Sequence, residues 1–375
     1  MKITEIIATH LSVPLEERYW MSLSPIGGME PKVDKLLLEI RTDEGVSGMG
    51  EAKPGGAKLF QRGLGEFLVG EDPLMVEHIW RKVFAVTHTR TGTKRGWDKS
   101  GILAALAAID IALWDLVGKV AGLPLYRVFG GFTNTIPAYV TGGYYREGKG
   151  IPELVEEVQG YVGQGFDAIK LKVGGAPIAE DCERLAAVRD AIGDEIDIML
   201  DANRAYDPKS AIEAAQAFEQ YRIRWFEEPL HWYDDVRPLR TLREKTSLTI
   251  ASGEGESTRF GCREMIEQGL IDICQFDAHK NGGFTEWRKL AGMAAMYHVD
   301  MAPHHEPHLH GHLLASVPNG LILESFANPA RDPYWPALYA KGPRIVDSQL
   351  TLLEEPGIGV EFDADFVQRH GAVIG

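Results

Sequence analysis

From about Ile136 onward, short apolar runs alternate with amphipathic stretches of helical length, and this alternation constrains the fold more than any other feature. Strands that alternate with helices form parallel sheets, and eight such units favour closure into a barrel. We therefore predict an α/β fold with a (β/α)8-type barrel over residues 131–334, with an open doubly wound sheet as the alternative. The eight runs, about 25 residues apart, are PAYVT, AIKLKV, IDIMLD, IRWFE, LTIAS, DICQF, VDMAP and LILES.

The first 130 residues follow a different pattern. The runs MKITEIIATHLSV and VDKLLLEIRTDEGVSGMGEA are strand-like, and an EG turn divides the second, which indicates a β-meander. Helical stretches follow and end in SGILAALAAIDIALWDLVGKVAG, where Gly122 and Pro124 stop the helix. We predict an α+β domain over residues 1–130, completed by the Pro-rich segment of about residues 335–375.

Charge and composition limit the partners. With 54 acidic against 39 basic residues the formal charge is -15, which repels the nucleic-acid backbone, so we expect no nucleic-acid partner. The run MKITEIIATHLSVPLEER has acids and a proline where a signal peptide is apolar, and no later run approaches about 18 apolar residues. We expect a cytoplasmic protein with no membrane partner. The widely separated Cys182, Cys262 and Cys274 are predicted to be core residues.

Three carboxylates, Asp201, Glu227 and Glu254, close the third, fourth and fifth predicted strands. The carboxyl ends of barrel strands meet at one mouth, so residues far apart in sequence come together there. Converging carboxylates suit a hard cation that keeps open positions for substrate oxygens, which describes Mg²⁺ rather than zinc. Each acid could instead be a helix N-cap or the partner of a lysine, and the ion could be structural. Glu228 and Glu256 are rivals for the ligand roles.

Lys170 and Lys172 flank Leu171 on the second strand, so the strand period of two places both ammonium groups on the same side. Because Ile169, Leu171 and Val173 point toward the helices, we expect the lysines to face the barrel interior or its mouth. Two like charges in a partly dry site disfavour each other's protonation, which would leave one lysine as a neutral base near pH 7. A pair of surface lysines on an edge strand is the alternative.

The sixth strand ends in Asp277, and the seventh ends in the cluster HHEPHLHGH, in which His304 comes first. An Asp and a His at the ends of neighbouring strands predict a dyad in which the Asp fixes the tautomer and raises the basicity of the His. A zinc site in the cluster is disfavoured because no complementary Cys or HExxH motif is present. The eighth strand ends in Glu324, which could hydrogen-bond a substrate carboxylate if protonated, or pair with a Lys or Arg.

The order KLK, DAN, FEEP and SGE, followed by an Asp, a His and a Glu on successive strands, resembles the enolase superfamily, specifically its mandelate racemase subgroup. The resemblance covers nearly the whole chain and implies a modified (β/α)7β barrel with an α+β capping domain. It also implies a role for each matched position. Asp201, Glu227 and Glu254 resemble the Mg²⁺ ligands, Lys172 the base on one substrate face tuned by Lys170, His304 and Asp277 the opposite dyad, Glu324 the electrophilic acid, and Asn203 a substrate contact.

The resemblance implies one shared half-reaction. A proton α to a carboxylate is weakly acidic because the enediolate carries two negative charges, which Mg²⁺ and a hydrogen-bond donor stabilise. If the substrate has a β-hydroxyl, protonated His304 expels it as water and a 2-keto-3-deoxy acid results. We favour this acid-sugar dehydration because most members of the resembled subgroup dehydrate sugar acids. The alternative is a racemase or epimerase of a 2-hydroxy acid.

Two other classes are less well supported. A non-catalytic, metal-stabilised binding protein on the same scaffold would need a broken catalytic set, and no matched position departs from the pattern. A metal-dependent amidohydrolase would need an HxH after the first strand, where the chain has YVTGGYY. His308 and His310 form an HxH only after the seventh strand.

The expected substrate is a small carboxylic acid, and polar and aromatic residues near the mouth suit a sugar acid. In the resembled family, capping-domain loops set specificity, here around YWMSLSPIGG and EAKPGGAKLF, whose glycines suit lid motion. Trp20 is either a lid contact or a core residue of the capping domain. A homo-oligomer of open size is expected. The predicted substrate contacts are Asn203, Trp20, Tyr144 and His231, with Tyr145 nearby.

Overall fold

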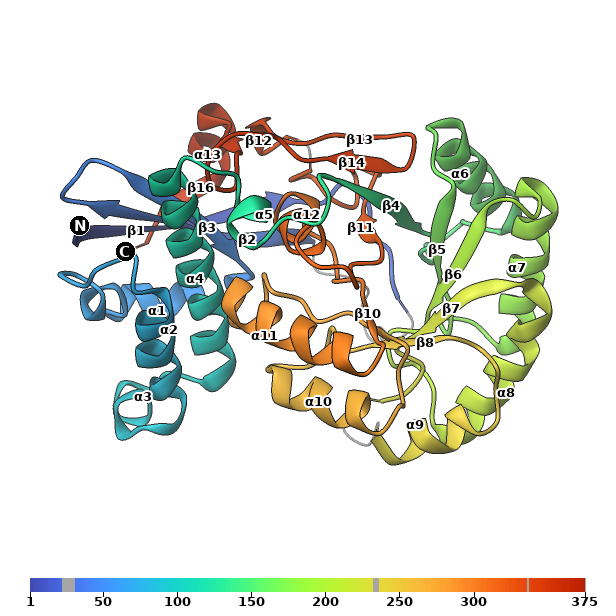
Figure 1. Ribbon diagram of the computed structural model, residues 1–375. Helices are drawn as coiled ribbons and strands as arrows, with labels where there is room; N and C mark the ends of the chain where they lie inside the picture. The colour runs from blue at the N-terminus through green and yellow to red at the C-terminus, as the bar shows by residue number, and fades with distance from the viewer. Residues whose placement is uncertain (22–30, 232–235, 336, 375) are drawn as a thin grey trace.

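The computed structural model describes residues 1–21, 31–231, 236–335 and 337–374. Two units lie side by side (Figure 1): an antiparallel sheet with its helices, formed mainly by the N-terminal part, and a barrel formed by the following part. The predicted α/β class, with an α+β capping unit and a barrel, is confirmed, and the open doubly wound sheet is wrong. Of the two predicted specificity loops, YWMSLSPIGG (residues 19–28) lies partly outside the described residues and EAKPGGAKLF (residues 51–60) lies within them; the segment 232–235 after His231 lies outside them.

All eight predicted runs form strands of the barrel. Seven of them are hydrogen-bonded neighbours in chain order, and β11 pairs in parallel with β4. A bridge between Met301 and Gly320 joins β10 to the segment that leads into β11, so the ring closes. The strands are β4 (Thr135–Gly142), β5 (Ala168–Lys172), β6 (Asp197–Asp201), β7 (Ile223–Glu227), β8 (Ile250–Ser252), β9 (Ile273–Cys274), β10 (Asp300–Met301) and β11 (Leu323–Ser325).

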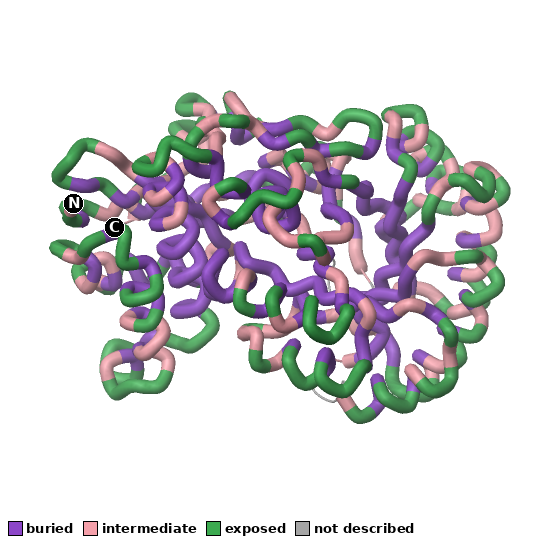
Figure 2. The backbone as a smooth tube through the Cα atoms, viewed as in Figure 1, coloured by how far each residue is buried: buried purple, intermediate pink, exposed green. Residues whose placement is uncertain are grey.

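Helices surround the barrel because the strands present alternate side chains to its inside and outside. The inside carries a small cluster that includes Tyr139, Met199 and Trp225, whereas the outside packs on the helices in a large apolar layer. Figure 2 shows the strands as almost continuously buried, with exposure concentrated in helices and loops. The helices are α6 (Ile151–Gly163), α7 (Ile178–Ile192), α8 (Pro208–Phe218), α9 (Val236–Arg243), α10 (Arg259–Glu267), α11 (Gly283–Met296) and α12 (Pro307–Leu314).

The N-terminal unit is a four-stranded sheet covered by helix α4 (Lys99–Ala121). Two glycines of β3 let this helix approach closely, since a Cβ at Gly50 would lie 2.1 Å from the carbonyl oxygen of Ala108. Gly48 meets Ala112 in the same way. The other elements of the unit are β1 (Ile3–Pro14), β2 (Lys32–Thr42), β3 (Ser47–Ala52), α1 (Ala57–Gln61), α2 (Val76–Phe84), α3 (Arg90–Arg95) and α5 (Leu125–Val128).

Helix α4 is the most apolar helix of the described chain and the only one there with the length and composition of a membrane span. It begins at Asp98, whose carboxylate accepts the N–H of Gly101, and ends at Gly122 in the left-handed conformation. Within its most apolar stretch 89% of the residues are buried, and it carries Asp110 and Asp115. It is therefore a core helix. Asp110 and Asp115 interrupt its apolar residues, so the sequence did not indicate a membrane span here.

The segment after the barrel contacts both units. Strand β16 (Gly371–Val373) pairs with β1, and a cluster containing Leu338 and Phe366 packs on Leu11 and Leu37. In contrast, β14 (Gln349–Thr351) pairs with barrel strand β4. The domain boundaries near residues 130 and 335 therefore stay a prediction. The remaining elements are β13 (Ile345–Val346), the pair β12 (Tyr339–Lys341) and β15 (Glu361–Phe362), and α13 (Ala364–His370).

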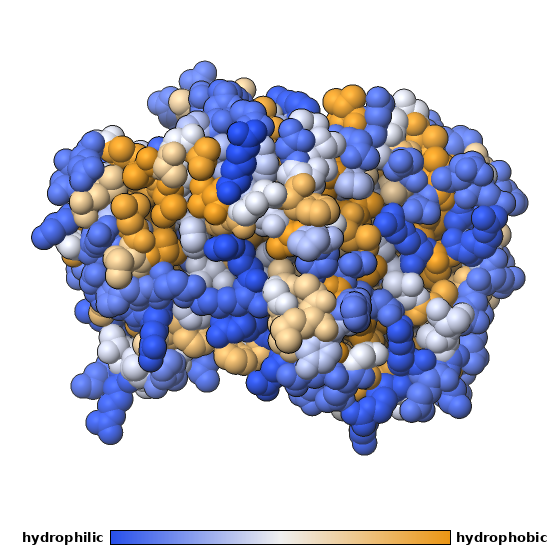
Figure 3. Space-filling model, viewed as in Figure 1, coloured by the Kyte–Doolittle hydropathy of each residue, from blue (hydrophilic) through white to orange (hydrophobic). Residues whose placement is uncertain are grey.

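The surface and the cysteines complete the description. Hydrophilic residues dominate the outline of the face drawn in Figure 3, while hydrophobic residues gather over the N-terminal unit. Cys262 and Cys274 are buried as predicted, but Cys182 is only half-buried, and all three are free thiols.

Candidate functional site

The barrel strands bring the predicted acids and lysines into one buried cluster. Lys172 is aligned with Asp201 on the next strand, and Asp201 is aligned with Glu227 on the one after. The side chains of Asp201 and Glu227 are at most 1% exposed. We call the whole set, at the carboxyl ends of the strands, the barrel-mouth cluster. Its members are Lys170, Lys172, Asp201, Glu227, Glu254, Asp277, His304 and Glu324.

Lys170 lies at the centre of this cluster and is fully buried. Its Nζ is 2.7 Å from Glu227 Oε1, 2.8 Å from Glu324 Oε1 and 3.7 Å from Asp201 Oδ2. Lys172 forms its ion pair with Asp201. Both lysines thus face inward, as the strand period predicted, while Ile169, Leu171 and Val173 belong to the outer apolar layer.

The protonation of the lysines differs from the expected neutral base. Burial alone would lower the pKa of Lys172, but the Asp201 carboxylate outweighs it, so the pKa is raised. The pKa of Lys170 is also raised, because Glu227 and Glu324 outweigh its burial. The prediction that one of two close lysines is neutral did not include these carboxylates. Their attraction for each ammonium group outweighs the repulsion between the two lysines.

Glu227 carries an excess of negative charge around it. Burial and the charge of Asp201 raise the pKa of its carboxyl well above the usual value, although Lys170 opposes this. Its second oxygen accepts hydrogen bonds from Trp225 Nε1 at 3.1 Å and from Gln275 Nε2 at 2.6 Å. At Glu227 the ammonium of Lys170 therefore does not offset burial and the charge of Asp201.

The two rival acids, Glu228 and Glu256, have the following contacts in the described structure. Glu228 has a positive φ of 38° and pairs with Arg204 at 2.8 Å, and burial raises the pKa of its carboxyl to about 8. The backbone oxygen of Glu256 accepts a hydrogen bond from Asn281 Nδ2, at the loop before α10. Glu254 is buried and lies in contact with His304, with 3.6 Å between Glu254 Oε2 and His304 Nε2.

His304 and Asp277 form the predicted pair. His304 Nδ1 lies 3.1 Å from Asp277 Oδ2, and the side chain of Asp277 is fully buried. Burial would lower the pKa of His304, but Glu254 and the hydrogen bond with Asp277 raise it overall. The same contact with His304 lowers the pKa of Asp277 against the effect of its burial. His304 Nε2 remains the ring nitrogen that faces Glu254.

Glu324 is ionised rather than protonated. Burial would raise its pKa, but the ammonium of Lys170 lowers it well below the usual value. The hydroxyl of Thr141 donates to Glu324 Oε1 at 2.5 Å, and the N–H of His305 donates to Oε2 at 3.0 Å. Of the two sequence-based possibilities, pairing with a lysine is the one observed.

The predicted substrate contacts are not all brought together. Asn203 follows Asp201 in the left-handed conformation, and its buried side-chain oxygen has no partner among the described residues. The Tyr144 ring lies 5.3 Å from Lys172 Nζ. Trp20 forms a backbone bridge with Tyr145 and stacks on its ring at 6.4 Å, so it packs on the rim. The charge of His231 acts on Asp207 before helix α8, outside the barrel-mouth cluster.

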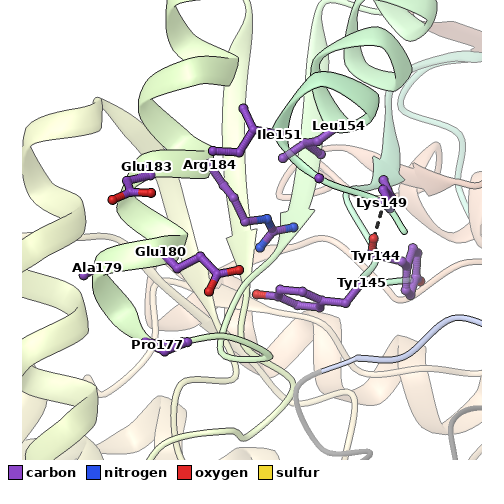
Figure 4. Close-up of a pocket in the computed structure, with 11 residues that line it drawn as sticks. Tyr144, Tyr145, Lys149, Ile151, Leu154, Pro177, Ala179, Glu180, Glu183 and Arg184 are labelled. Atoms are coloured by element: carbon purple, nitrogen blue, oxygen red, sulfur yellow. Dashed lines mark hydrogen bonds between the residues drawn. The ribbon is translucent and has the colours of Figure 1, made fainter. Parts of the chain in front are cut away.

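A large cavity adjoins the cluster without containing its acids. It measures about 530 Å³ and lies between the loop after β4 and helix α7 (Figure 4). Its wall includes Arg184 and Tyr145, whose hydroxyl donates to Asp181 at 2.6 Å. Lys149 donates to the carbonyl oxygen of Tyr144, as the dashed line in Figure 4 shows. Tyr144 therefore borders both this cavity and Lys172.

The sequence reading missed a second buried cluster between the two units. Glu51, His279 and Glu306 place one ligand atom each within 4.8 Å of one another, the only such group of metal-binding type in the described residues. Lys35 Nζ binds Glu306 Oε2 at 2.8 Å and Glu51 Oε2 at 3.3 Å. His308 and Tyr339 also bond Glu51. We call these residues the interdomain cluster: Lys35, Glu51, His279, Glu306, His308 and Tyr339.

Little in the sequence could have revealed these partners. Lys35 and Glu306 are 271 positions apart. The rule that residues at the ends of parallel strands come together applies only to the barrel. Gln275 and Thr141 do have a signal, since each is a polar residue inside or beside an apolar strand run. A buried polar residue needs a hydrogen-bond partner, so these two positions indicate polar side chains nearby. Their partners are Glu227 and Glu324 of the barrel-mouth cluster.

The barrel-mouth acids fit a hard divalent cation by their chemistry. Asp201, Glu227 and Glu254 are all oxygen donors and all are buried, and burial together with the charge of Asp201 raises the pKa of Glu227. A cation bound by these oxygens would offset that charge. The predicted Mg²⁺ site is compatible with this set.

Comparison with known proteins defines the class of the chain. Residues 153–366 match the family described as enolase C-terminal domain-like, and residues 26–130 match the mandelate racemase / muconate lactonizing enzyme N-terminal domain. This pairing of a capping domain with a barrel defines an enolase-type enzyme. The chain belongs to the enolase superfamily, in its mandelate racemase and muconate lactonizing enzyme subgroup, as the sequence resemblance predicted.

The most similar relatives include both enzymes and solved structures. The chain is 32% identical to arabinonate dehydratase of Saccharolobus solfataricus, over 89% of each protein. It is 33% identical to L-talarate/galactarate dehydratase of Salmonella typhimurium, over 78% of this chain and 72% of that enzyme. A mandelate racemase/muconate lactonizing enzyme from a marine actinobacterium, in complex with magnesium, has a TM-score of 0.87 at 34% identity and 99% coverage of both chains.

Proposed function

We propose that this enzyme removes the proton α to the carboxylate of a sugar acid and then expels the β-hydroxyl as water, giving a 2-keto-3-deoxy acid. The observation that carries this proposal is that two groups able to transfer a proton, Lys172 and His304, each contact a different acid of the barrel-mouth cluster. Lys172 pairs with Asp201, and His304 Nε2 lies 3.6 Å from Glu254 Oε2. A substrate carboxylate held at these acids through a cation would place its α-carbon between the two groups.

The acids Asp201, Glu227 and Glu254 would hold Mg²⁺, the metal found in similar structures. Bound Mg²⁺ supplies positive charge that stabilises the negative charge developing on the substrate carboxylate, and it competes with Lys172 for Asp201. Lys170 stays protonated between Glu227 and Glu324, and it holds both acids in place.

The protonation of His304 suits the elimination step. Asp277 fixes Nδ1 and, with Glu254, raises the pKa of the ring, so a proton is available on Nε2. A protonated imidazole beside the β-carbon donates that proton to the departing hydroxyl. Once a cation replaces its ammonium at Asp201, Lys172 would be a neutral amine, placed to receive the α-proton from the other side.

Relatives support dehydration and keep a second candidate open. Dehydratases of arabinonate, L-talarate/galactarate and D-xylonate are among them, but so are cycloisomerases and a hydrophobic dipeptide epimerase. The specific observation in favour of epimerisation is the presence of both Lys172 and His304, because one group can remove a proton and the other return it.

A library experiment separates the two reactions. The Mg²⁺-loaded protein is incubated with five- and six-carbon aldonic and aldaric acids, and 2-keto acid is measured together with α-hydrogen exchange in deuterated water. We expect a keto acid from at least one sugar acid. Exchange without any keto acid would replace dehydration by epimerisation, and neither exchange nor keto acid would contradict the proposal as a whole.

A further inference from the structure

A cavity of about 270 Å³ opens beside His304, between the two units of the molecule. It is distinct from the larger cavity at α7, and its lining includes His304, His305, Glu306 and His279 from the barrel loops. Residues of β2, of the segment after β3 and of the chain after β11 form the rest. The volume is close to the lower limit of small-molecule sites, so it suits the far end of a short substrate rather than a cofactor.

The walls of this cavity carry more positive than negative charge. Three acids line it, and each already has a basic partner. Asp34 pairs with Lys32 at 3.1 Å, Glu306 pairs with Lys35 at 2.8 Å, and Asp332 pairs with His305 Nε2 at 2.9 Å. Two cations of the same lining, Lys53 and Arg331, are left over.

Lys53 and Arg331 have no carboxylate partner among the described residues. Lys53 is half-buried in the segment after β3, and its charge acts on Glu306 and His279 across the cavity. Arg331 is fixed by stacking rather than by an ion pair. Its guanidinium lies 5.4, 5.1 and 4.9 Å from the ring centres of Tyr19, Tyr144 and Phe326.

An unpaired cation that is partly removed from water is costly unless an anion meets it. An arginine held on aromatic rings keeps its planar donors oriented for a carboxylate. His304, Lys53 and Arg331 line the same cavity, and Asp201, Glu227 and Glu254 do not, so the cavity offers a place for an anion beside His304.

We propose that Lys53 and Arg331 bind a second, distal carboxylate of the substrate, which makes the preferred substrate a diacid of the aldaric type. This inference rests on the proposed function for the reacting carboxylate at the other end. The distal carboxylate would sit in the cavity while the α-carbon lies between Lys172 and His304. A monoacid of the same length would leave both cations without an anion.

The test compares each six-carbon aldaric acid with the aldonic acid of matching configuration. We expect the wild-type protein to show a kcat/KM at least about tenfold higher for the best diacid than for its monoacid partner, as the loss of charged hydrogen bonds implies. Lys53→Met should raise the KM for the diacid by a similar factor, with little change in kcat and little effect on the monoacid. Because Lys53 is half-exposed, this variant is expected to fold.

Two controls keep the result specific. Lys58→Met removes an exposed lysine five positions away on α1, outside the cavity, and should change neither substrate's KM. Arg331→Met is the second variant, and thermal unfolding checks that the loss of its ring contacts leaves the protein folded. Its KM for the diacid should rise at least as much as that of Lys53→Met.

The outcomes separate this inference from the proposed function. Turnover of a monoacid with equal or greater kcat/KM than every diacid, or an unchanged KM in Lys53→Met, would overturn the diacid inference while dehydration stands. Absence of α-hydrogen exchange with all the acids would overturn both.

Discussion

The two buried charge clusters, at the barrel mouth and between the units, contain the same kinds of residue but balance them differently. In the interdomain cluster Lys35 binds two acids, and burial fails to raise the pKa of Glu51, which Lys35 and His308 lower to about 2. At the barrel mouth the pKa of Glu227 is raised despite its contact with Lys170. At Glu51 the ammonium of Lys35 outweighs burial, whereas at Glu227 burial and the charge of Asp201 outweigh the ammonium of Lys170.

This difference teaches that spacing alone does not identify a metal site. The ligand atoms of Glu51, His279 and Glu306 are the closest group of their kind in the described chain, yet an ammonium already lies 2.8 Å from one of them. At the barrel mouth no three acids of the described chain approach so closely, but the pKa of Glu227 stays raised by burial and by Asp201. The two criteria favour different clusters, so the proposed Mg²⁺ site at the barrel mouth needs a direct test.

The largest expected effect comes from the proton-carrying groups of the barrel mouth. Lys172→Ala and His304→Asn should each lower kcat by about 10²–10⁴-fold, because each removes a group that transfers a proton to or from the substrate. Steady-state turnover of the sugar acid identified in the library measures this. Lys209→Met, on exposed α8, is the control and should retain activity. Near-normal kcat in both site variants would eliminate the two-group mechanism.

The next effect separates the clusters by metal affinity. Glu227→Gln should weaken Mg²⁺ binding by at least the roughly 10–100-fold that even supporting residues of metal sites contribute. Glu51→Gln should leave the affinity unchanged, since the ammonium of Lys35 already binds both Glu51 and Glu306. Calorimetric titration with MgCl₂ alone measures both. A larger loss of affinity in Glu51→Gln would place the ion between the units instead.

For the free energy of unfolding, in contrast to Mg²⁺ affinity, we expect the larger effect from Glu51→Gln and the smaller one from Glu227→Gln. Glu51→Gln is expected to lower the free energy of unfolding by about 3 kcal/mol, because it breaks a buried ion pair from one side. Urea unfolding of the metal-free protein measures it. Glu227→Gln should cost less, because its carboxyl is disfavoured in the ionised form, as its raised pKa indicates. If the two variants lose equal stability, the clusters do not differ in charge balance.

The smallest expected effect is the pH dependence of the stability difference between the wild-type protein and Glu51→Gln. The pKa of Glu51 falls from 4.5 to about 2 in the folded protein, so its contribution is full above pH 4.5 and is lost as the pH falls toward 2. The stability difference between wild type and Glu51→Gln should therefore shrink by about 2 kcal/mol between pH 5 and pH 3. A difference that is constant over this interval would contradict the lowered pKa.

The sequence predicted the fold well because its signal is local and repeated. Each strand run of the barrel is short, apolar and followed by a helix, and the position of each acid at a strand end needs no knowledge of distant contacts. Lys172 and Asp201 were thus placed on adjacent strands before the register was known, and the register aligns them.

What the sequence could not supply is charge balance between distant segments. The pKa of Lys172 depends on Asp201, an acid of another strand. The pKa of Glu324 depends in the same way on Lys170 in the barrel interior. Lys35 belongs to β2 and Glu306 to the segment before α12, so no periodicity relates them. Only the three-dimensional arrangement shows that Lys53 and Arg331 share a cavity with His304.

The pairing of β16 with β1 has a consequence for the making of the protein. Val373 lies opposite Thr9, so the first sheet receives its fourth strand from residues near the other end of the chain. A chain emerging from the ribosome has synthesised its entire barrel before that strand is available. The N-terminal sheet must therefore persist with an open edge through most of translation, and the charged side chain of Glu5 and the polar Thr9 and His10 on β1 would help to keep that edge from pairing with other chains.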